Sequence, residues 1–308
     1  MKVVALGGGH GLAATLSSLK KIAGAEITAI VGVSDNGGSS GRLRAEFGVL
    51  PPGDLRMALT ALCDDGEKSW AEVLQFRFAG QGPLAGHSAG NLLITALWQS
   101  KQNIVQGLDA VSNLLHAKGR VLPLALTPID LVAETITSAG TLEIVQGQVE
   151  IATTPNRVVK ILTDGSNVEA CPETLEAIGA AEVVVLGPGS WFTSVLTHLT
   201  IPKVAQALVE STALKVLVLN LVAQSGETDG FSPAEHLEAI GQEEPLLNFD
   251  FVVIDTELVS TEVEIVAKRL GWRLVSAPLA ENSDPTKHDL EALSQILQNC
   301  ISTVERIS

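Results

Sequence analysis

The chain has no tyrosine, and aromatic residues make up 4% of its 308 residues. Proteins that hold single-stranded nucleic acid without sequence preference stack bases on aromatic side chains, so this scarcity argues against such a role. Basic residues are also few: 20 Lys and Arg stand against 35 Asp and Glu, a formal net charge of −15. Binding to the phosphate backbone of DNA or RNA requires clustered Lys and Arg side chains. The composition therefore argues against nucleic-acid binding, although a few backbone N–H groups can still hold a single nucleotide.

Cysteine and long apolar runs are also scarce. Cys63, Cys171 and Cys300 are widely spaced and odd in number, so they predict neither a disulfide framework nor a CxxC metal site. No apolar run reaches the roughly 18 residues of a membrane span, and the first residues lack the pattern of a secretory signal. We therefore expect a cytoplasmic protein without a membrane span. Hydrophobic residues, at 46% of the chain, supply enough apolar surface for a core.

The succession of apolar runs indicates an α/β fold. Residues 3–6 form a β-rich run, and a glycine cluster at 7–11 breaks it; apolar residues then recur at helical spacing before a second β-rich run at 27–33. Such a βαβ unit implies parallel strands joined by a right-handed crossover. The sequence predicts one domain over 1–308, a Rossmann-like, doubly wound and mostly parallel sheet. Short β-type pieces separated by turns, among them a predicted strand at 149–151, predict a small antiparallel β-excursion at about 120–165.

The first candidate site is the glycine cluster Gly7-Gly-Gly-His-Gly11, between the first strand and the first helix. Glycines let the backbone approach an anion, and the N–H groups of the following helix point toward it. The cluster does not match the G-x-G-x-x-G dinucleotide fingerprint, because Leu12 or Ala14 stands where the third glycine would fall. It therefore predicts a turn that contacts phosphate, with His10 as a further candidate for a hydrogen bond.

A long polar loop is predicted over residues 34–53, directly after the second strand. Ligands of doubly wound sheets bind at the carboxyl ends of the strands, where this loop begins. Its small residues allow close approach, and Arg42 can pair with a phosphate. Asp35, or Asp54 just beyond the loop, could hold Mg²⁺ or a hydroxyl group. We interpret the loop as a second part of the ligand site.

A third segment, Gly86-His-Ser-Ala-Gly90, has the G-x-S-x-G pattern of a hydrolase nucleophile elbow, and His288 follows late in the chain as that mechanism requires. The elbow must leave a buried strand, however, and a Gly/Pro-rich loop precedes residue 86. Ser88 is better interpreted as the N-cap of a helix. His87 and Asn91, which lie beside that cap, could still face a ligand.

Two further segments follow predicted strands later in the chain. Residues 186–194 read Leu-Gly-Pro-Gly-Ser-Trp-Phe-Thr-Ser, a tight turn that leads into a helix, and they again predict a helix N-terminus facing an anion. In the second segment, Asn220 and Gln224 could hydrogen-bond a base edge, and Thr228 or Asp229 a sugar hydroxyl. Two such turns on one sheet suit a ligand with separated polar groups, such as a nucleotide diphosphate.

Taken in order, these motifs resemble the bacterial gluconeogenesis-factor family (YvcK-like), a sibling of the 2-phospho-L-lactate transferases (CofD-like). The sequence departs from that family's pattern at three positions: His10, where threonine is usual; Asn36, where a second aspartate is usual; and Ser225, where proline is usual. The segments that carry the resemblance are residues 7–11, 35–44, 51–56, 86–91, 187–194 and 224–230.

The resemblance implies a Rossmann-like core, a cytoplasmic location and a nucleotide-type ligand. In the gluconeogenesis-factor branch, the implied ligand is a UDP-sugar and the role is regulatory, in carbon metabolism and in cell shape and cell wall. In the transferase branch, it is a guanylyl-activated phospholactate that is transferred to a deazaflavin with Mg²⁺. Because Asn36 weakens a metal site built on two carboxylates, the first hypothesis is a UDP-sugar-binding regulator without turnover, and the transferase is the alternative.

The predicted site binds a ligand and has no assigned catalytic residue. The expected partners are a nucleotide-sugar and further copies of the chain in a homo-oligomer, and Mg²⁺ at Asp35 or Asp54 is the one cofactor considered. The predicted ligand-binding residues are Gly8, Gly9, His10, Gly11, Asp35, Asn36, Gly37, Ser39, Ser40, Arg42, Asp54, His87, Asn91, Gly187, Gly189, Ser190, Thr193, Asn220, Gln224, Thr228 and Asp229.

Overall fold

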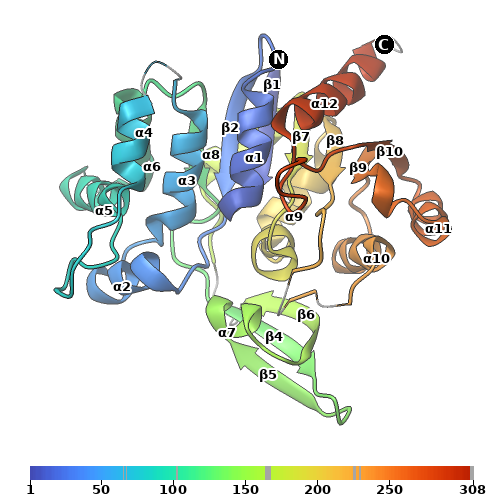
Figure 1. Ribbon diagram of the computed structural model, residues 1–308, viewed down its shortest axis with the longest axis horizontal. Helices are drawn as coiled ribbons and strands as arrows, with labels where there is room; N and C mark the ends of the chain where they lie inside the picture. The colour runs from blue at the N-terminus through green and yellow to red at the C-terminus, as the bar shows by residue number, and fades with distance from the viewer. Residues whose placement is uncertain are drawn as a thin grey trace.

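The main feature of the structure is a sheet of seven parallel strands in the order β10-β9-β8-β7-β1-β2-β3 (Figure 1). It is a computed structural model that describes residues 1–64, 66, 68–101, 103–163, 168–224, 227–228 and 230–305. The strands are β1 (Lys2–Gly7), β2 (Glu26–Val31), β3 (Arg120–Pro123), β7 (Val183–Leu186), β8 (Leu214–Val218), β9 (Phe251–Asp255) and β10 (Arg273–Ala277). Because β2 and β7 flank β1, the strand order reverses there, as in doubly wound nucleotide-binding folds. The predicted Rossmann-like architecture is confirmed.

Helices pack on this sheet from both sides. The crossover from β1 to β2 runs along the sheet in the opposite direction to the one from β7 to β8, so right-handed connections place α1 and α9 on opposite faces. Figure 1 shows α1 across the near face of β1 and β2. Coverage of both faces explains why β7 and β8 are buried along their whole length. The helices are α1 (Gly9–Leu19), α2 (Gly38–Phe47), α3 (Pro52–Leu62), α4 (Lys68–Gln75), α5 (Ala89–Lys101), α6 (Ile104–Leu114), α8 (Pro172–Gly179), α9 (Pro202–Glu210), α10 (Pro233–Glu243), α11 (Thr261–Leu270) and α12 (Leu290–Glu305).

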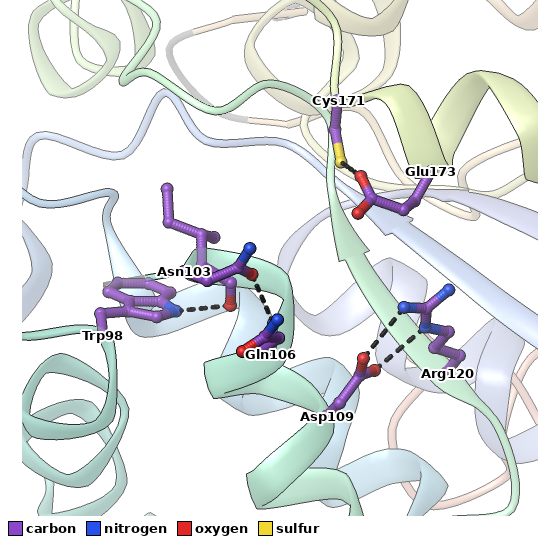
Figure 2. Close-up of polar contacts among 8 residues, drawn as sticks. Trp98, Asn103, Gln106, Asp109, Arg120, Cys171 and Glu173 are labelled. Atoms are coloured by element: carbon purple, nitrogen blue, oxygen red, sulfur yellow. Dashed lines mark hydrogen bonds and ion pairs between the residues drawn. The ribbon is translucent and has the colours of Figure 1, made fainter. Parts of the chain in front are cut away.

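The edge strand β3 is fixed to helix α6 by a paired ionic contact. Arg120, at the start of β3, donates from Nε to Asp109 Oδ1 at 3.0 Å and from Nη2 to Asp109 Oδ2 at 2.9 Å (Figure 2). The helix itself begins after Asn103, whose side chain accepts a hydrogen bond from the Gln106 N–H at 2.8 Å. This arrangement ties the polar outer end of the strand to the neighbouring helix and leaves its apolar residues in the core.

A second, three-stranded antiparallel sheet lies beyond the carboxyl edge of the large sheet (Figure 1). Its strands, in the order β5-β4-β6, are β4 (Leu131–Ile136), β5 (Leu142–Gln146) and β6 (Arg157–Thr163). Buried residues of β4 and β6, such as Ala133 and Ile161, belong to the same apolar core as the large sheet. The antiparallel part begins later than the predicted residue 120, because β3 pairs in parallel with β2. That residues 1–308 form a single domain stays a prediction.

Three local predictions differ from the structure. The predicted loop at 34–53 contains helix α2, which the sequence hides because only Ser39, Ser40 and Leu43 are buried along it. The predicted strand at 149–151 is helix α7 (Gln148–Ala152), and the Val149 N–H at its start donates to the Asn36 side chain at 2.9 Å. The predicted helix after Ser190 is a π-helical turn, η2 (Trp191–Val195), followed by a 3₁₀ turn, η3 (Leu196–His198).

Within the part of the chain that the structure describes, no helix is long and apolar enough to cross a membrane.

Candidate functional site

Two glycine turns meet at the carboxyl edge of the sheet, where β1 and β7 lie side by side. A Cβ built on Gly11, in the first turn of α1, would lie 2.0 Å from the Pro188 carbonyl oxygen, which belongs to the turn after β7. A Cβ on Gly187 would lie 2.9 Å from Thr15 Oγ1 of α1. The two predicted glycine segments are therefore in contact, at the point in the strand order where ligands of doubly wound sheets bind.

The first turn presents the N-terminus of α1. Gly8 is its N-cap and makes no side-chain cap bond, and no acidic residue of α1 stands in its first turn. Gly9 has φ +56°, and the nearest atom to a Cβ built there is Asp54 Oδ1 at 4.0 Å, so the space beside it is open. His10 is exposed. The N-terminus of α1 therefore offers backbone N–H groups and the positive end of the helix dipole to an approaching anion.

Asp54, in the first turn of α3, lies against this helix end. The Gly9 N–H donates to its carboxylate, and a Cβ on Gly8 would lie 2.6 Å from Asp54 Oδ2. Burial and, next in size, the neighbouring Asp35 raise the pKa of Asp54 to about 6, against the opposing effects of the Gly9 hydrogen bond and Arg56. A carboxylate thus already accepts one of the N–H groups that a phosphate would use.

Asp35 approaches Asp54 from the loop after β2. Its Oδ1 accepts a hydrogen bond from the Gly37 N–H at 2.8 Å, and its Oδ2 would lie 3.3 Å from a Cβ built on Gly53. The two carboxylates could supply part of a Mg²⁺ site and leave the remaining positions to water or phosphate, as Mg²⁺ sites commonly do. Among the residues that the structure describes, no three His, Cys, Asp or Glu side chains come together to hold a metal.

The raised pKa of Asp54 leads to a stability prediction. Because the folded-state pKa of about 6 lies above the ordinary value of 3.8, Asp54 stabilises the fold most when protonated, and this contribution is lost as pH rises through 6. With a chelator present at about pH 8, Asp54→Asn should raise the free energy of unfolding by about 3 kcal/mol, since one pKa unit is worth about 1.4 kcal/mol. Urea unfolding should show this advantage shrinking as the pH is lowered toward about 4.

Asp284 provides the control of opposite sign. Hydrogen bonds from Lys287 and then from Thr286 lower its pKa to about 2, so Asp284→Asn should reduce stability near neutral pH. An Asp54→Asn advantage that is the same at about pH 8 and about pH 4 would contradict the assignment of a raised pKa to this carboxyl.

Several predicted residues form a buried network beside these turns. Ser39 Oγ lies 2.8 Å from His87 Nδ1 and accepts from Asn91 Nδ2 at 3.0 Å. Asn91 Oδ1 in turn accepts from Arg56 Nε at 3.0 Å. All four residues are buried, and burial, followed by the charge of Arg42, lowers the pKa of His87. The structure brings the three predicted residues together and adds Arg56, but their polar atoms bind one another and join α2, α3 and α5.

Ser88 is placed as a helix cap and not as a nucleophile. It is fully buried, and its Oγ accepts a hydrogen bond from the Asn91 N–H at 3.3 Å, at the start of α5. Its backbone forms only an isolated antiparallel bridge with Arg77, so no strand delivers it to a sheet edge. The geometry of a hydrolase elbow is absent at this serine.

The remaining predicted residues of the second segment bind other parts of the protein. Arg42 is exposed and donates to the carbonyl oxygens of Pro83 at 3.3 Å and Ala85 at 2.8 Å. Asn36 donates to Glu150 Oε2 at 2.9 Å. Ser40 Oγ accepts from the Gly53 N–H at 3.0 Å, which fastens α2 to the start of α3 and therefore to Asp54.

The second glycine turn is held by side chains from the loop after β8. Asn220 accepts from the Gly189 N–H and donates to the Gly189 carbonyl, both at 2.8 Å. Glu227 accepts from the Ser190 hydroxyl, from the Thr193 hydroxyl at 2.6 Å and from the Phe192 N–H at 3.1 Å. Thr228 closes the same loop by donating from N–H to the Gln224 carbonyl at 2.9 Å and accepting from the Gln224 N–H at 2.8 Å. Asp229 lies outside the described residues.

Sequence reasoning missed Glu227, Arg56 and Ser194, whose Oγ would lie 3.3 Å from a Cβ on Gly8. Acidic residues in loops after strands are usually solvated, so nothing in the local pattern separates Glu227 from an exposed neighbour. A cavity of about 820 Å³ also lies away from the turns, at the amino ends of β1 and β2, and includes none of the predicted site residues. The candidate site is therefore the surface formed by the two glycine turns, Asp35, Asp54 and Asn220.

Comparison with known proteins places this geometry in a family. A family model described as 2-phospho-L-lactate transferase CofD matches residues 3–304. A Mycobacterium tuberculosis protein is 46% identical over 267 residues, covering 85% of this chain and 78% of that protein. A Thermotoga maritima protein is 37% identical over 319 residues, covering 97% and 98%. A Listeria innocua protein named gluconeogenesis factor is 37% identical over 262 residues, covering 85% and 80%, and the first two carry that name provisionally.

A solved structure agrees with these matches. The crystal structure of a UPF0052-family protein from Bacillus halodurans superposes with a TM-score of 0.88 at 35% identity, covering 96% of this chain and 98% of that one. The likeness extends over the parallel sheet, its helices and the antiparallel excursion, because nearly all of both chains is included. The chain therefore belongs to the gluconeogenesis-factor proteins of the CofD family.

Proposed function

We propose that the chain binds a UDP-sugar at the two glycine turns and acts without turnover as a regulator of carbon metabolism, cell shape and cell wall. The contact between Gly11 and the Pro188 carbonyl carries the proposal, because it joins two turns into one anion-facing surface. The N-terminus of α1, where Gly8 makes no side-chain cap bond, supplies for a phosphate the N–H groups that Asp54 does not take up, as helix ends commonly do. Asn220 binds both the N–H and the carbonyl of Gly189, and its second amide N–H would serve a polar group of the ligand.

A diphosphate at Gly9 would approach the carboxylates of Asp35 and Asp54, and like charges in one site repel. A divalent cation between the phosphates and these carboxylates would offset that repulsion, which is the usual arrangement of Mg²⁺ at phosphate sites. Mg²⁺ is therefore part of the proposal, as are a cytoplasmic location and a homo-oligomer. A nicotinamide dinucleotide fits less well, because Leu12 and Ala14 stand where the third glycine of its fingerprint would pack.

Calorimetry tests the proposed ligand class. UDP-glucose and UDP-N-acetylglucosamine should bind with Mg²⁺ present, should bind more weakly with a chelator, and should raise the melting temperature, since any ligand that favours the folded state does so. NADH at the same concentrations should give neither heat nor a shift. Binding of NADH with both UDP-sugars silent would overturn the proposal.

The transferase remains a second candidate, because the Asp35–Asp54 pair and the description of the matching family model both suit Mg²⁺-dependent transfer. In that reaction, the deazaflavin hydroxyl attacks the phospholactate phosphorus and GMP leaves. Incubation with the guanylyl-activated donor, a deazaflavin and Mg²⁺ should release no GMP if the chain is a binder only. GMP release that is lost in both Asp35→Asn and Asp54→Asn would establish the transferase instead.

A further inference from the structure

Glu227 is a buried carboxylate that no cation pairs with in the described part of the chain. It is 4% exposed, and the nearby Arg157 forms its ion pair with Glu235 instead. Burying an ionised carboxylate is costly unless hydrogen bonds replace its lost hydration. Three donors do so here, and all three belong to the segment from Ser190 to Thr193 that follows the second glycine turn. All three hydrogen bonds that the Glu227 carboxylate accepts therefore come from residues 190–193.

That segment has an irregular backbone that needs outside support. The Ser190 carbonyl accepts from the N–H groups of both Ser194 at 2.8 Å and Val195 at 2.9 Å, which is the wide turn of a π-helix. Such turns are rare, mostly occur as single turns and are frequent at functional sites. Because η2 follows directly on the glycine turn, the position of Ser190 sets the direction in which Gly187–Ser190 leaves the sheet.

Thr193 connects the same segment to two further parts of the candidate site. Its carbonyl accepts from Ser34 Oγ, in the loop after β2, at 3.2 Å, and its Oγ1 accepts from Gln148 Nε2 of α7 at 3.4 Å. Glu227 therefore holds a residue at which the loop after β2, the antiparallel excursion and the second glycine turn meet. A shift of Thr193 would be transmitted to all three.

We propose that Glu227 is a positioning residue for the second glycine turn. Its carboxylate fixes Ser190, Phe192 and Thr193, and through them it keeps the turn in the shape that receives the anionic part of the ligand. Glu227 acts through these hydrogen bonds and not by contact with the ligand, because a second negative charge would repel a diphosphate. The inference rests on the proposed function above and assigns a role to a residue that local sequence patterns leave unmarked.

Three variants test this role. Glu227→Ala removes all three hydrogen bonds, whereas Glu227→Gln keeps an oxygen for the Phe192 N–H and a group that the two hydroxyls can bind. Glu235→Ala is the matched control, because Glu235 closes the capping box of α10 with Ser232 and pairs with Arg157 but makes no hydrogen bond to the turn. Loss of that cap should lower stability without moving the glycine turn.

Amide hydrogen exchange of the ligand-free proteins is measured first. Glu227→Ala should speed exchange at residues 187–195, while Glu227→Gln and Glu235→Ala should leave it close to the wild-type rate. Calorimetry with UDP-glucose and UDP-N-acetylglucosamine follows. Glu227→Ala should weaken binding at least tenfold, Glu227→Gln should stay within about threefold of wild type, and Glu235→Ala should be unchanged despite a lower melting temperature.

The results separate this inference from the proposed function. Wild-type exchange at residues 187–195 in Glu227→Ala would overturn the positioning role, as would a loss of affinity in Glu227→Gln as large as that in Glu227→Ala, which would indicate direct contact through charge. If the wild-type protein binds neither UDP-sugar, the proposed function fails, while the exchange measurement still decides whether Glu227 positions the turn.

Discussion

Replacing Gly11 with alanine should lower the free energy of unfolding by about 3 kcal/mol or more, near the upper end of single-residue effects, and should abolish UDP-sugar binding. The added Cβ would lie 2.0 Å from the Pro188 carbonyl oxygen and 2.5 Å from its carbon, and both are backbone atoms that cannot rotate away. Relief of the clash requires the two glycine turns to separate. Urea unfolding measures the stability, and calorimetry measures the binding.

Gly179→Ala is the matched control for this substitution. Gly179 is also a helical glycine, at the end of α8, and a Cβ there would meet no atom within 4 Å. Alanine is a better helix former than glycine, so this variant should be neutral or slightly more stable and should bind normally. A Gly11→Ala protein with the stability of wild type would show that the turns can move apart at little cost.

Replacing Gly9 with valine should abolish UDP-sugar binding and leave the fold largely intact. Gly9 has φ +56°, so a side chain adds strain of the order of 1–2 kcal/mol, which a stable domain can absorb. The nearest atom to its Cβ is Asp54 Oδ1 at 4.0 Å, so the valine would fill open space at the N-terminus of α1. That space is where the proposed phosphate would lie. Calorimetry measures the binding, and circular dichroism checks the fold.

Gly24→Val separates the backbone strain from the effect on the site. Gly24 has φ +75°, a Cβ there would meet no atom within 4 Å, and it lies in the turn between α1 and β2, at the amino edge of the sheet. Gly24→Val should therefore lower the free energy of unfolding by a similar amount and leave the affinity for UDP-sugars unchanged. Equal affinities for Gly9→Val, Gly24→Val and wild type would remove the first glycine turn from the ligand site.

Local patterns were sufficient for the parallel sheet and for the presence of the two glycine turns. β7 is a short, continuously apolar run and β8 is interrupted only by Lys215, because both faces of the sheet are covered there, and that composition marks a buried parallel strand without reference to any neighbour. The motifs that identify the family are likewise short runs of consecutive residues, so they can be recognised without the tertiary structure. This dependence on local patterns also explains the wrong predictions at α2, where few residues are buried, and at α7, whose Val149 N–H donates to Asn36, 113 positions away.

The sequence by itself determined the strands of the parallel sheet, the sheet type, the family and the glycine segments, because each depends on residues that are neighbours in the chain. Only the tertiary structure decided at which positions a side chain larger than that of glycine would clash, and with which atoms. Gly11 is closed in by Pro188 from another turn, whereas Gly9 faces open space. Likewise, Glu227 is buried against Ser190, 37 positions away, only because β7 and β8 are adjacent in the sheet. This burial is what lets a glutamate in a loop hold the second glycine turn in place. Burial and close approach are set by what packs from elsewhere in the fold, and local residue order does not encode them.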